Sequence, residues 1–420
     1  MTDDQVEYTS TPEIEAMPED DSQVEIKLIT KLEAKYQIPE DKIIVPGSVT
    51  RLDLSELVNE SLSLEERIPF DFLIEGEFIR GSLSRHCIDR GILSEKTVEI
   101  EYVIAIEEPE SSTLTEPQKD WICGISVSSN AFFTSSMDGV LTKYDLESGK
   151  VTLKSSQSQL PIHDVACTDN GVVVTVSKDG HVRFSDMDSL EVISCGKLDH
   201  GIHSVSLCPF DHTLVLTGSA HGQVHLWNVP VVMKTSKSKK RTSVEQVEPR
   251  ATLLQKPSTI VGLAWLSLSK AVAASQDGNM HFFDPMSGQT FPTISTSRAM
   301  SSMSLLGSSK VVTGHPDGRI IFWDLKKDGQ ALSMEALNSC RSHGRMIARL
   351  AAQPGSESLI ASASLDGCIK LFDRRASHFA VQSISLPTSE RALVVAWIDE
   401  SKFLSGASDG VVRVHTMKLA

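Results

Sequence analysis

A glycine-centred turn recurs seven times along the C-terminal two-thirds of this chain. The residue before the glycine is Asp in six copies and His in one, and the gaps between successive glycines are 41, 42, 56, 40, 49 and 43 residues. A supersecondary unit that repeats at about 40 residues predicts a β-propeller, in which each repeat contributes one four-stranded blade. The turn glycines are Gly139, Gly180, Gly222, Gly278, Gly318, Gly367 and Gly410.

Alternating apolar residues flank each turn, which is the pattern of a β-hairpin. The strand after the turn often ends in an aromatic residue and an acid or amide, as in Trp227-Asn228 and Trp323-Asp324. These repeats resemble WD40 repeats over roughly residues 103–420. The tryptophan is kept only at those two positions, and His415 stands in the last repeat. The resemblance implies a seven-bladed WD40 propeller over residues 121–420.

Composition excludes several classes of protein. With 40 Lys and Arg against 55 Asp and Glu, the net charge is −15, which argues against general nucleic-acid binding. The longest apolar run, residues 392–398, is too short to cross a bilayer, and the acidic N-terminus has no apolar signal core. The seven cysteines form no Cys-x-x-Cys pair and are expected to be reduced core residues. They are Cys87, Cys123, Cys167, Cys195, Cys208, Cys340 and Cys368.

The segment before the repeats divides into a tail and a small domain. Residues 1–22 are acidic without one Lys or Arg, which predicts a disordered tail. Residues 23–102 have the periodicity of a β-strand, a second strand, a helix with Asp53 as its N-cap, and two further strands around a short helical turn. This order predicts a ubiquitin-like (β-grasp) domain. The expected elements are strands 24–29, 42–45, 70–74 and 97–102, the helix 53–62 and the helical turn 83–88.

The stretch Pro69-Phe-Asp-Phe-Leu-Ile-Glu-Gly-Glu-Phe-Ile-Arg-Gly-Ser-Leu83 is more particular. Together with residues 54–59, it resembles the NLE domain of eukaryotic ribosome-assembly proteins, which include Notchless and the WD-repeat subunits of the PeBoW (pescadillo / block-of-proliferation) complex. The sequence Phe-Asp-Phe-Leu-Ile-Glu-Gly-Glu and the seven repeats favour the PeBoW subunits. The resemblance implies a non-enzymatic factor of the large (60S) ribosomal subunit and rRNA maturation, in the nucleolus and nucleoplasm. It implies no cofactor.

The same resemblance implies the partners and one site residue. The propeller would dock the block-of-proliferation protein, with pescadillo held indirectly, on the pre-60S particle. Glu95, in the loop Ser94-Glu95-Lys96, corresponds to the glutamate that completes the MIDAS metal site of the AAA ATPase midasin. From the residues alone, a loop glutamate is a solvated charge. Since the metal would belong to the partner, the resemblance implies no metal site within this chain.

A basic stretch falls inside the 56-residue gap and is expected to be an insertion between two blades, at about residues 230–250. Its five cations predict a nuclear-import signal, an RNA-phosphate contact or a solvated loop, and the sequence leaves these readings open. The cations are Lys234, Lys237, Lys239, Lys240 and Arg241.

No enzymatic motif stands out in the sequence, which has no His-Glu-x-x-His and no Gly-x-Ser-x-Gly. We expect the turn aspartates to hold their own turns through side-chain to backbone hydrogen bonds, and His343 to support its own blade. These aspartates are Asp138, Asp179, Asp277, Asp317, Asp366 and Asp409.

Three alternative functions remain open: a Notchless-like pre-60S factor with an eighth blade, a ubiquitin-pathway adaptor, and a propeller hydrolase. A structural expectation also follows from the last repeat. It ends just past its hairpin at Lys418, so no chain remains for the outermost strand of that blade. Since a propeller without that strand keeps an open edge, we expect the strand to come from residues 103–120. The most apolar candidate there is Val103-Ile-Ala-Ile106, unless it extends the last strand of the small domain.

Overall fold

The chain forms two compact units, of which unit 1 ends at Ala105 and unit 2 begins at Ile106. The structure is a computed structural model, and it describes residues 23–39, 41–63, 66–92, 97–231, 244–328, 331–376, 379–387 and 390–418. The acidic segment 1–22, Glu95 and the basic stretch lie outside these ranges. The expected linker 103–120 is divided, because residues 103–105 fold with unit 1.

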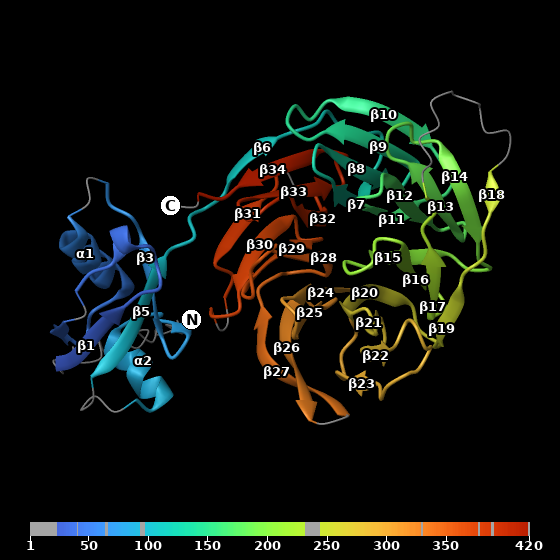
Figure 1. Cartoon of the computed structure of the whole chain (residues 1–420). Helices are drawn as coiled ribbons and strands as arrows, with labels where there is room; N and C mark the ends of the chain where they lie inside the picture. The colour runs from blue at the N-terminus through green and yellow to red at the C-terminus, as the bar shows by residue number, and fades with distance from the viewer. Residues whose placement is uncertain are drawn as a thin grey trace, which may run out of the picture. The chain divides into compact units, whose positions relative to one another are not determined.

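Unit 1 is a five-stranded sheet with two α-helices and a short 3-10 helix (Figure 1). The strand order is β2-β1-β5-β3-β4, in which β1 and β5 are parallel and every other pair is antiparallel. Its elements are β1 (Gln23–Ile29), η1 (Ala34–Tyr36), β2 (Lys42–Pro46), α1 (Arg51–Leu62), β3 (Phe70–Ile74), β4 (Glu77–Phe78), α2 (Leu83–Arg90) and β5 (Val98–Ile104).

The start of α1 corrects one sequence-based assignment. The N-cap is Thr50 rather than Asp53, which is the third helical residue and closes a capping box. The Thr50 N–H donates to the Asp53 carboxylate at 2.8 Å, and bonds to the Thr50 backbone and hydroxyl lower the pKa of Asp53. A capping acid three residues into a helix and an N-cap acid look alike in sequence, because both precede an apolar periodicity.

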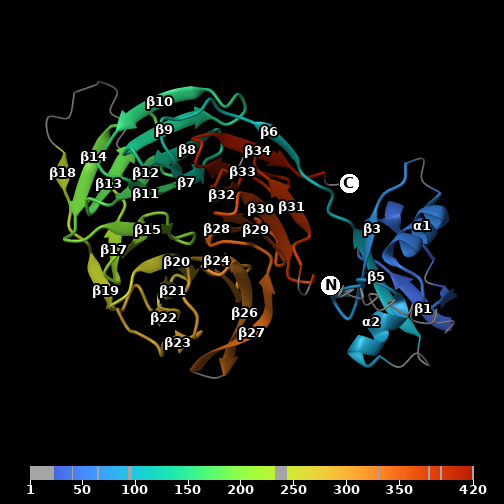
Figure 2. The ribbon, with the colours of Figure 1, turned by 180° about the vertical axis from the view of Figure 1, so that it is seen from behind.

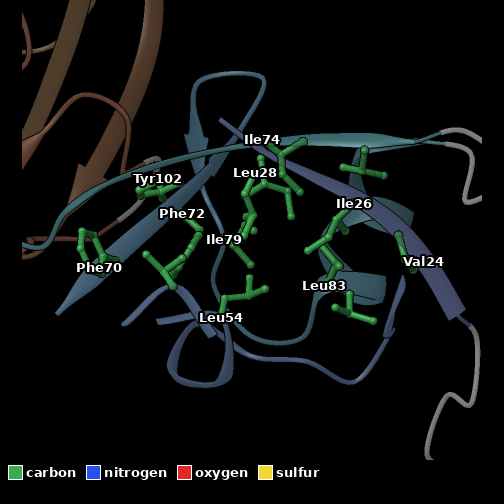
Figure 3. Close-up of a cluster of buried hydrophobic side chains, with 14 of the residues drawn as sticks. Val24, Ile26, Leu28, Leu54, Phe70, Phe72, Ile74, Ile79, Leu83 and Tyr102 are labelled. Atoms are coloured by element: carbon green, nitrogen blue, oxygen red, sulfur yellow. The ribbon is translucent and has the colours of Figure 1, made fainter. Parts of the chain in front are cut away.

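Alternation within the strands builds the core of unit 1 (Figure 3). Val24, Ile26 and Leu28 of β1 are buried, and the residues between them are half-buried. Tyr102 of β5 is also buried and keeps its hydroxyl satisfied, since it donates to the Tyr36 carbonyl at 2.7 Å. A buried phenol without such a partner would destabilise the fold.

Unit 2, over its described residues, contains seven sheets of four or five strands arranged in a ring (Figures 1 and 2). The first strands of neighbouring sheets contact one another all the way round, and the contact of the last with the first closes the circle. These seven strands therefore line the centre of the ring. They are β7 (Ile122–Val127), β11 (Ile162–Cys167), β15 (Ile202–Leu207), β20 (Ile260–Ser267), β24 (Ser302–Leu306), β28 (Ile347–Ala352) and β32 (Ala392–Trp397).

The second and third strands of each sheet follow antiparallel, joined by the predicted glycine turns. The second strands are β8 (Ala131–Ser136), β12 (Val172–Ser177), β16 (Leu214–Ser219), β21 (Lys270–Ser275), β25 (Lys310–Gly314), β29 (Leu359–Ser364) and β33 (Lys402–Ala407). The third strands are β9 (Val140–Asp145), β13 (His181–Asp186), β17 (Gln223–Asn228), β22 (Asn279–Phe283), β26 (Arg319–Asp328), β30 (Cys368–Asp373) and β34 (Val412–Thr416).

Six sheets take their fourth strand from the chain that follows the third strand. These are β10 (Val151–Ser156), β14 (Val192–Lys197), β19 (Ala251–Gln255), β23 (Ile294–Ser295), β27 (Ala331–Arg341) and β31 (Gln382–Ser385). A fifth strand, β18 (Glu245–Gln246), pairs in parallel with β14.

Small residues let the sheets pack closely. Every residue of β8, β12, β16 and β29 is buried, and each strand carries Ser, Thr, Gly or Ala toward its end. Gly406 of β33 shows why: a Cβ there would lie 2.8 Å from Cγ2 of Ile122, on the first strand of the next sheet. The small residues at the end of a second strand therefore pack against a β-branched residue of the neighbouring sheet, and this close contact keeps interior packing dense.

The last sheet takes its fourth strand from the other end of unit 2. β6 (Glu110–Thr113) pairs antiparallel with β34, so that Glu110 faces Thr416 and Thr113 faces Arg413. The apolar candidate Val103-Ile-Ala-Ile106 is not the closing strand. Val103 and Ile104 instead extend β5 and pair with β3 in unit 1, which is the alternative that the sequence left open. The closing strand is polar because all four of its residues are exposed at the rim of the ring.

Apolar residues on both sides hold this polar strand in place. Ile106 packs against the core of the last two sheets, and Leu114 packs against the core between the last and first sheets. Gly149, with φ +64°, lies against Leu114, where a Cβ would stand 2.0 Å from the Leu114 carbonyl oxygen.

Replacement of Gly149 by Ala should therefore destabilise unit 2 more than the same change at Gly171. Both glycines have positive φ, which costs an L-residue about 1–2 kcal/mol, but Gly171 has open space around it. We expect Gly171→Ala to lower the melting temperature by roughly 2–6 °C and Gly149→Ala by at least about twice as much, measured by circular dichroism. Equal shifts would contradict the close contact with Leu114.

Candidate functional site

The segment that contains Glu95 joins two well-fixed elements of unit 1. Helix α2 ends at Arg90, and Gly91 caps it with a left-handed backbone (φ 67°). On the other side, Thr97 donates a hydrogen bond to Glu25, whose carboxylate also pairs with Lys42 at 2.7 Å. These three polar residues tie the start of β5 to β1 and β2. Glu95 itself lies outside the described residues, so its role stays a prediction.

The basic stretch also lies outside the described residues, but both of its flanks are fixed. Val229, just after β17, is buried, and the Val247 N–H donates to the Cys195 carbonyl at 3.0 Å, beside the β18–β14 pairing. The expectation of an insertion between two blades was wrong, because the insertion joins the third and fourth strands, β17 and β19, of one sheet. Two successive turn glycines lie in neighbouring sheets. Their spacing in the sequence therefore could not show whether the extra residues lie within one sheet or between two sheets.

The turn aspartates hold their own turns, as predicted. Each carboxylate accepts a hydrogen bond from the backbone N–H two residues later, at 2.9 to 3.3 Å. In the one turn with His221, Ser219 takes over this task by accepting from the N–H of Gln223 at 3.0 Å. These six aspartates lie in turns of six different sheets, so they do not form a carboxylate cluster.

His343 supports its own sheet, also as predicted. Its imidazole lies between the Asp366 carboxylate at 2.9 Å and the Ser362 hydroxyl at 2.8 Å, and the ring is buried. Burial opposes the charged form of Asp366, but the bonds from His343 and the Gly344 N–H outweigh it and hold the pKa of Asp366 well below its usual range. The group is therefore a fixed structural network.

An ion pair across the centre of the ring was missed in the sequence. Arg349 of β28 donates to both carboxylate oxygens of Asp164 of β11, at 2.8 and 3.0 Å, although the two residues are 185 positions apart. Asp164 is buried and also accepts from the N–H of Val205. Both residues stand third in their strands, just after a register shift that recurs in the first strands of most sheets. Aligning those strands would have revealed the opposite charges.

Signs of catalysis or metal binding do not appear among the described residues. No three His, Cys, Asp or Glu residues there lie close enough to hold a metal ion. A hollow between two neighbouring sheets in the described part is lined mainly by polar residues, and its one acid, Asp179, is paired with Arg183 at 2.6 Å. Among the described residues no disulfide joins any of the seven cysteines, and Cys123, Cys167 and Cys368 are half-buried rather than fully buried. No described helix is long and apolar enough to span a bilayer.

Two protein families match parts of the chain. The NLE (NUC135) domain matches residues 24–87, within unit 1, and the WD domain, G-beta repeat, matches residues 193–228 and 334–373 in unit 2. Each WD repeat covers the fourth strand of one sheet and the first three strands of the next, as β14–β17 do for residues 193–228. Because each repeat begins with the fourth strand of the preceding sheet, no repeat follows the last sheet to supply its fourth strand.

Relatives match over nearly the whole chain. A protein named ribosome biogenesis protein WDR12 homolog from Chlamydomonas reinhardtii is 25% identical, over 94% of this chain and 98% of its own length. One of the same name from Arabidopsis thaliana is 26% identical, over 93% and 96%. Ribosome biogenesis protein YTM1 from Coprinopsis cinerea is 25% identical, over 88% and 90%.

Loss of one partner of the cross-ring ion pair should destabilise unit 2. We expect Arg349→Ser to cost about 2–3 kcal/mol, because it leaves the buried Asp164 carboxylate unpaired, while the partial exposure of Arg349 keeps the loss moderate. The double variant Asp164→Ser/Arg349→Ser, which matches Ser204 at the equivalent place in β15, should recover part of the loss. A double-mutant cycle in urea measures the coupling, and purely additive losses would contradict a direct interaction.

Proposed function

We propose that this chain, which carries an NLE (NUC135) domain and WD40 repeats, is a non-enzymatic assembly factor of the large (60S) ribosomal subunit in the nucleolus and nucleoplasm. The observation that carries the proposal is the similarity, over nearly the whole length, to proteins named as ribosome biogenesis factors. The NLE match in unit 1 and the WD matches in unit 2 support the same conclusion.

In this proposal the two units are a ubiquitin-like domain and a seven-bladed propeller. The order β2-β1-β5-β3-β4, with a parallel central pair and α1 packed on the sheet, supports the ubiquitin-like assignment. The closed circle of seven first strands supports the propeller. A count of seven sheets also favours a PeBoW subunit over a Notchless-like factor, for which an eighth blade is expected.

The propeller serves as a rigid platform that docks the block-of-proliferation protein and, through it, pescadillo. Its suitability rests on the fixed turns. Because each turn is held by a bond such as that of Asp366 to the Cys368 N–H at 3.0 Å, the loops present a constant surface without ordering cost on binding. Binding partners use loops on a rigid scaffold for this reason.

The ubiquitin-like domain serves as the handle that midasin grips. Glu95 supplies the carboxylate that completes the divalent-metal coordination in the MIDAS domain of midasin, since hard divalent ions prefer oxygen ligands. The capped end of α2 and the tied start of β5 fix both ends of the Glu95 loop, and this supports a role as a protruding ligand. ATP hydrolysis in midasin would then pull the subunit off the pre-60S particle.

The basic stretch provides nuclear import or contacts ribosomal RNA. Val229 is buried, and the Val247 N–H is hydrogen-bonded to the ring, so both flanks of the stretch are fixed. Fixed flanks support a segment that is presented at the surface without strain on the sheets. The two roles depend on the same positive charges and are separated by the second experiment below.

Glu95→Gln should abolish binding to an isolated MIDAS domain of midasin, because the amide keeps the shape and loses the charge that the metal requires. Glu95→Asp should also fail, since it shortens the reach. The matched control is Glu75→Gln, an exposed glutamate in another turn of unit 1. Both Glu95 variants should still bind the block-of-proliferation protein. Calorimetric titration measures each affinity, and normal binding by Glu95→Gln would rule out the metal contact.

Neutralising Lys237, Lys239, Lys240 and Arg241 together should lower nuclear accumulation of a fluorescent fusion without changing the melting temperature, because the sheets are not involved. Lys150→Gln/Lys154→Gln, at two exposed lysines of another sheet, is the control. Retained import with lost RNA crosslinks would assign the stretch to RNA. If neither property changes, the stretch has no role beyond solvation.

A further inference from the structure

The covalent path from unit 1 to the ring passes directly through the strand that closes the ring. β5 ends at Ile104 in unit 1, and β6 begins at Glu110, as the outermost strand of the last sheet. Any force that pulls unit 1 away from the ring therefore reaches the ring first at Ile106 and then at β6. We call residues 106–118 the closing segment.

The closing segment is held by a row of polar contacts and by the apolar anchors Ile106 and Leu114. At its start, the Gln382 side chain donates to the Ile106 carbonyl, and Lys418 pairs with Glu110 at 3.2 Å. Four residue pairs then join β6 to β34. At its end, the Thr115 hydroxyl accepts from the Val412 N–H at 3.0 Å, and the Gln118 N–H donates to Gly410 at 2.8 Å. These contacts lie in a row, so they can break one after another from the Glu110 end.

His415 adds a buried side-chain contact to this row. In β17 and β26 the equivalent residue is Trp, whose single ring N–H donates to a threonine of the second strand, as Trp227 does to Thr217 at 2.9 Å. The imidazole of His415 has two nitrogens. One contacts Ser405 of the second strand and the other contacts Ser111 of β6, both at 2.7 Å. His415 is fully buried, so the last sheet uses this position to tie in a strand from elsewhere in the chain.

Unit 1 can pass on tension without unfolding. In the proposed function the pull enters at Glu95, two residues before Thr97 and the start of β5. From there it runs along the single strand β5, which lies between β1 and β3 in the sheet, and continues covalently to Glu110. The inner contacts of the ring, such as Ile122 against Gly406, do not depend on the closing segment.

We propose that the closing segment is a tension-sensitive clasp: a pull on unit 1 detaches residues 106–118 from β34 before unit 1 or the rest of the ring unfolds. Detachment removes the fourth strand of the last sheet and bares the edge of β34, which loosens a partner held at that sheet. This inference rests on the proposed function only for the source of the tension.

Magnetic tweezers test the clasp without midasin. Handles are joined to azide-bearing residues placed at positions 95 and 286, the second being exposed on another sheet of the ring. Release of residues 106–118, at about 3.5 Å per residue, should give a first lengthening of up to about 45 Å, well before the ring unfolds. A first step several times longer would mean that strands of the ring yield together with the closing segment, and would overturn the proposal.

A reversible lock provides the matched control. Glu110 and Thr416 face each other in the ladder, so Glu110→Cys/Thr416→Cys can form a disulfide across β6 and β34. Oxidation should abolish the first step and reduction should restore it in the same molecule. A step that persists at the same force in the oxidised form would overturn the proposal.

A second variant pair tests the His415 contact. Ser111→Ala removes the hydroxyl that meets His415 and should lower the force of the first step. Ser112→Ala changes the next residue of the same exposed strand, on its other face, and should leave that force unchanged. Equal forces for the two variants would contradict a clasp centred on His415. The result is separable from the proposed function, because binding of Glu95 to a MIDAS domain is measured on its own.

Discussion

The pairing of β6 with β34 is the interaction that completes the ring of unit 2. Every other sheet takes all of its first four strands from one continuous stretch, but the last sheet joins residues 110–113 to residues 412–416. The pairing gives the last sheet its fourth strand, while the contact of β32 with β7 joins the last sheet to the first. Without it, β34 would present an unpaired edge, the feature that natural sheets are built to avoid.

The parts of this fold that could be predicted from the sequence are those set by local patterns. The glycine turns and their supporting aspartates, the alternating strands of unit 1 and the support by His343 follow from short-range chemistry. What could not be predicted depends on long-range placement. The ladder between β6 and β34 joins residues about 300 positions apart, and its polar strand carries no marker of its partner. The pair of Asp164 with Arg349, 185 positions apart, can be found only after the first strands of the sheets are aligned.

The closing strand also shows why apolar character was a poor guide. Val103 and Ile104 were attractive because of their apolar side chains, yet these side chains serve β5 in unit 1. An edge strand at the rim has little to bury, and its affinity for β34 comes from backbone bonds, the Ser111–His415 contact and the flanking anchors Ile106 and Leu114. At the candidate site, the NLE resemblance pointed to Glu95 where residue chemistry alone described a solvated loop.

The distance along the chain between β6 and β34 also has a consequence for biosynthesis. At roughly 5–20 residues per second, a ribosome needs tens of seconds to make the intervening residues, about 300 in number. During that time Glu110–Thr113 has been synthesised and has no strand to pair with. Its sequence, Glu-Ser-Ser-Thr, is hydrophilic and remains exposed in the final fold, so the nascent strand can stay in water without attracting other chains. An apolar closing strand would carry an aggregation hazard through the whole of translation.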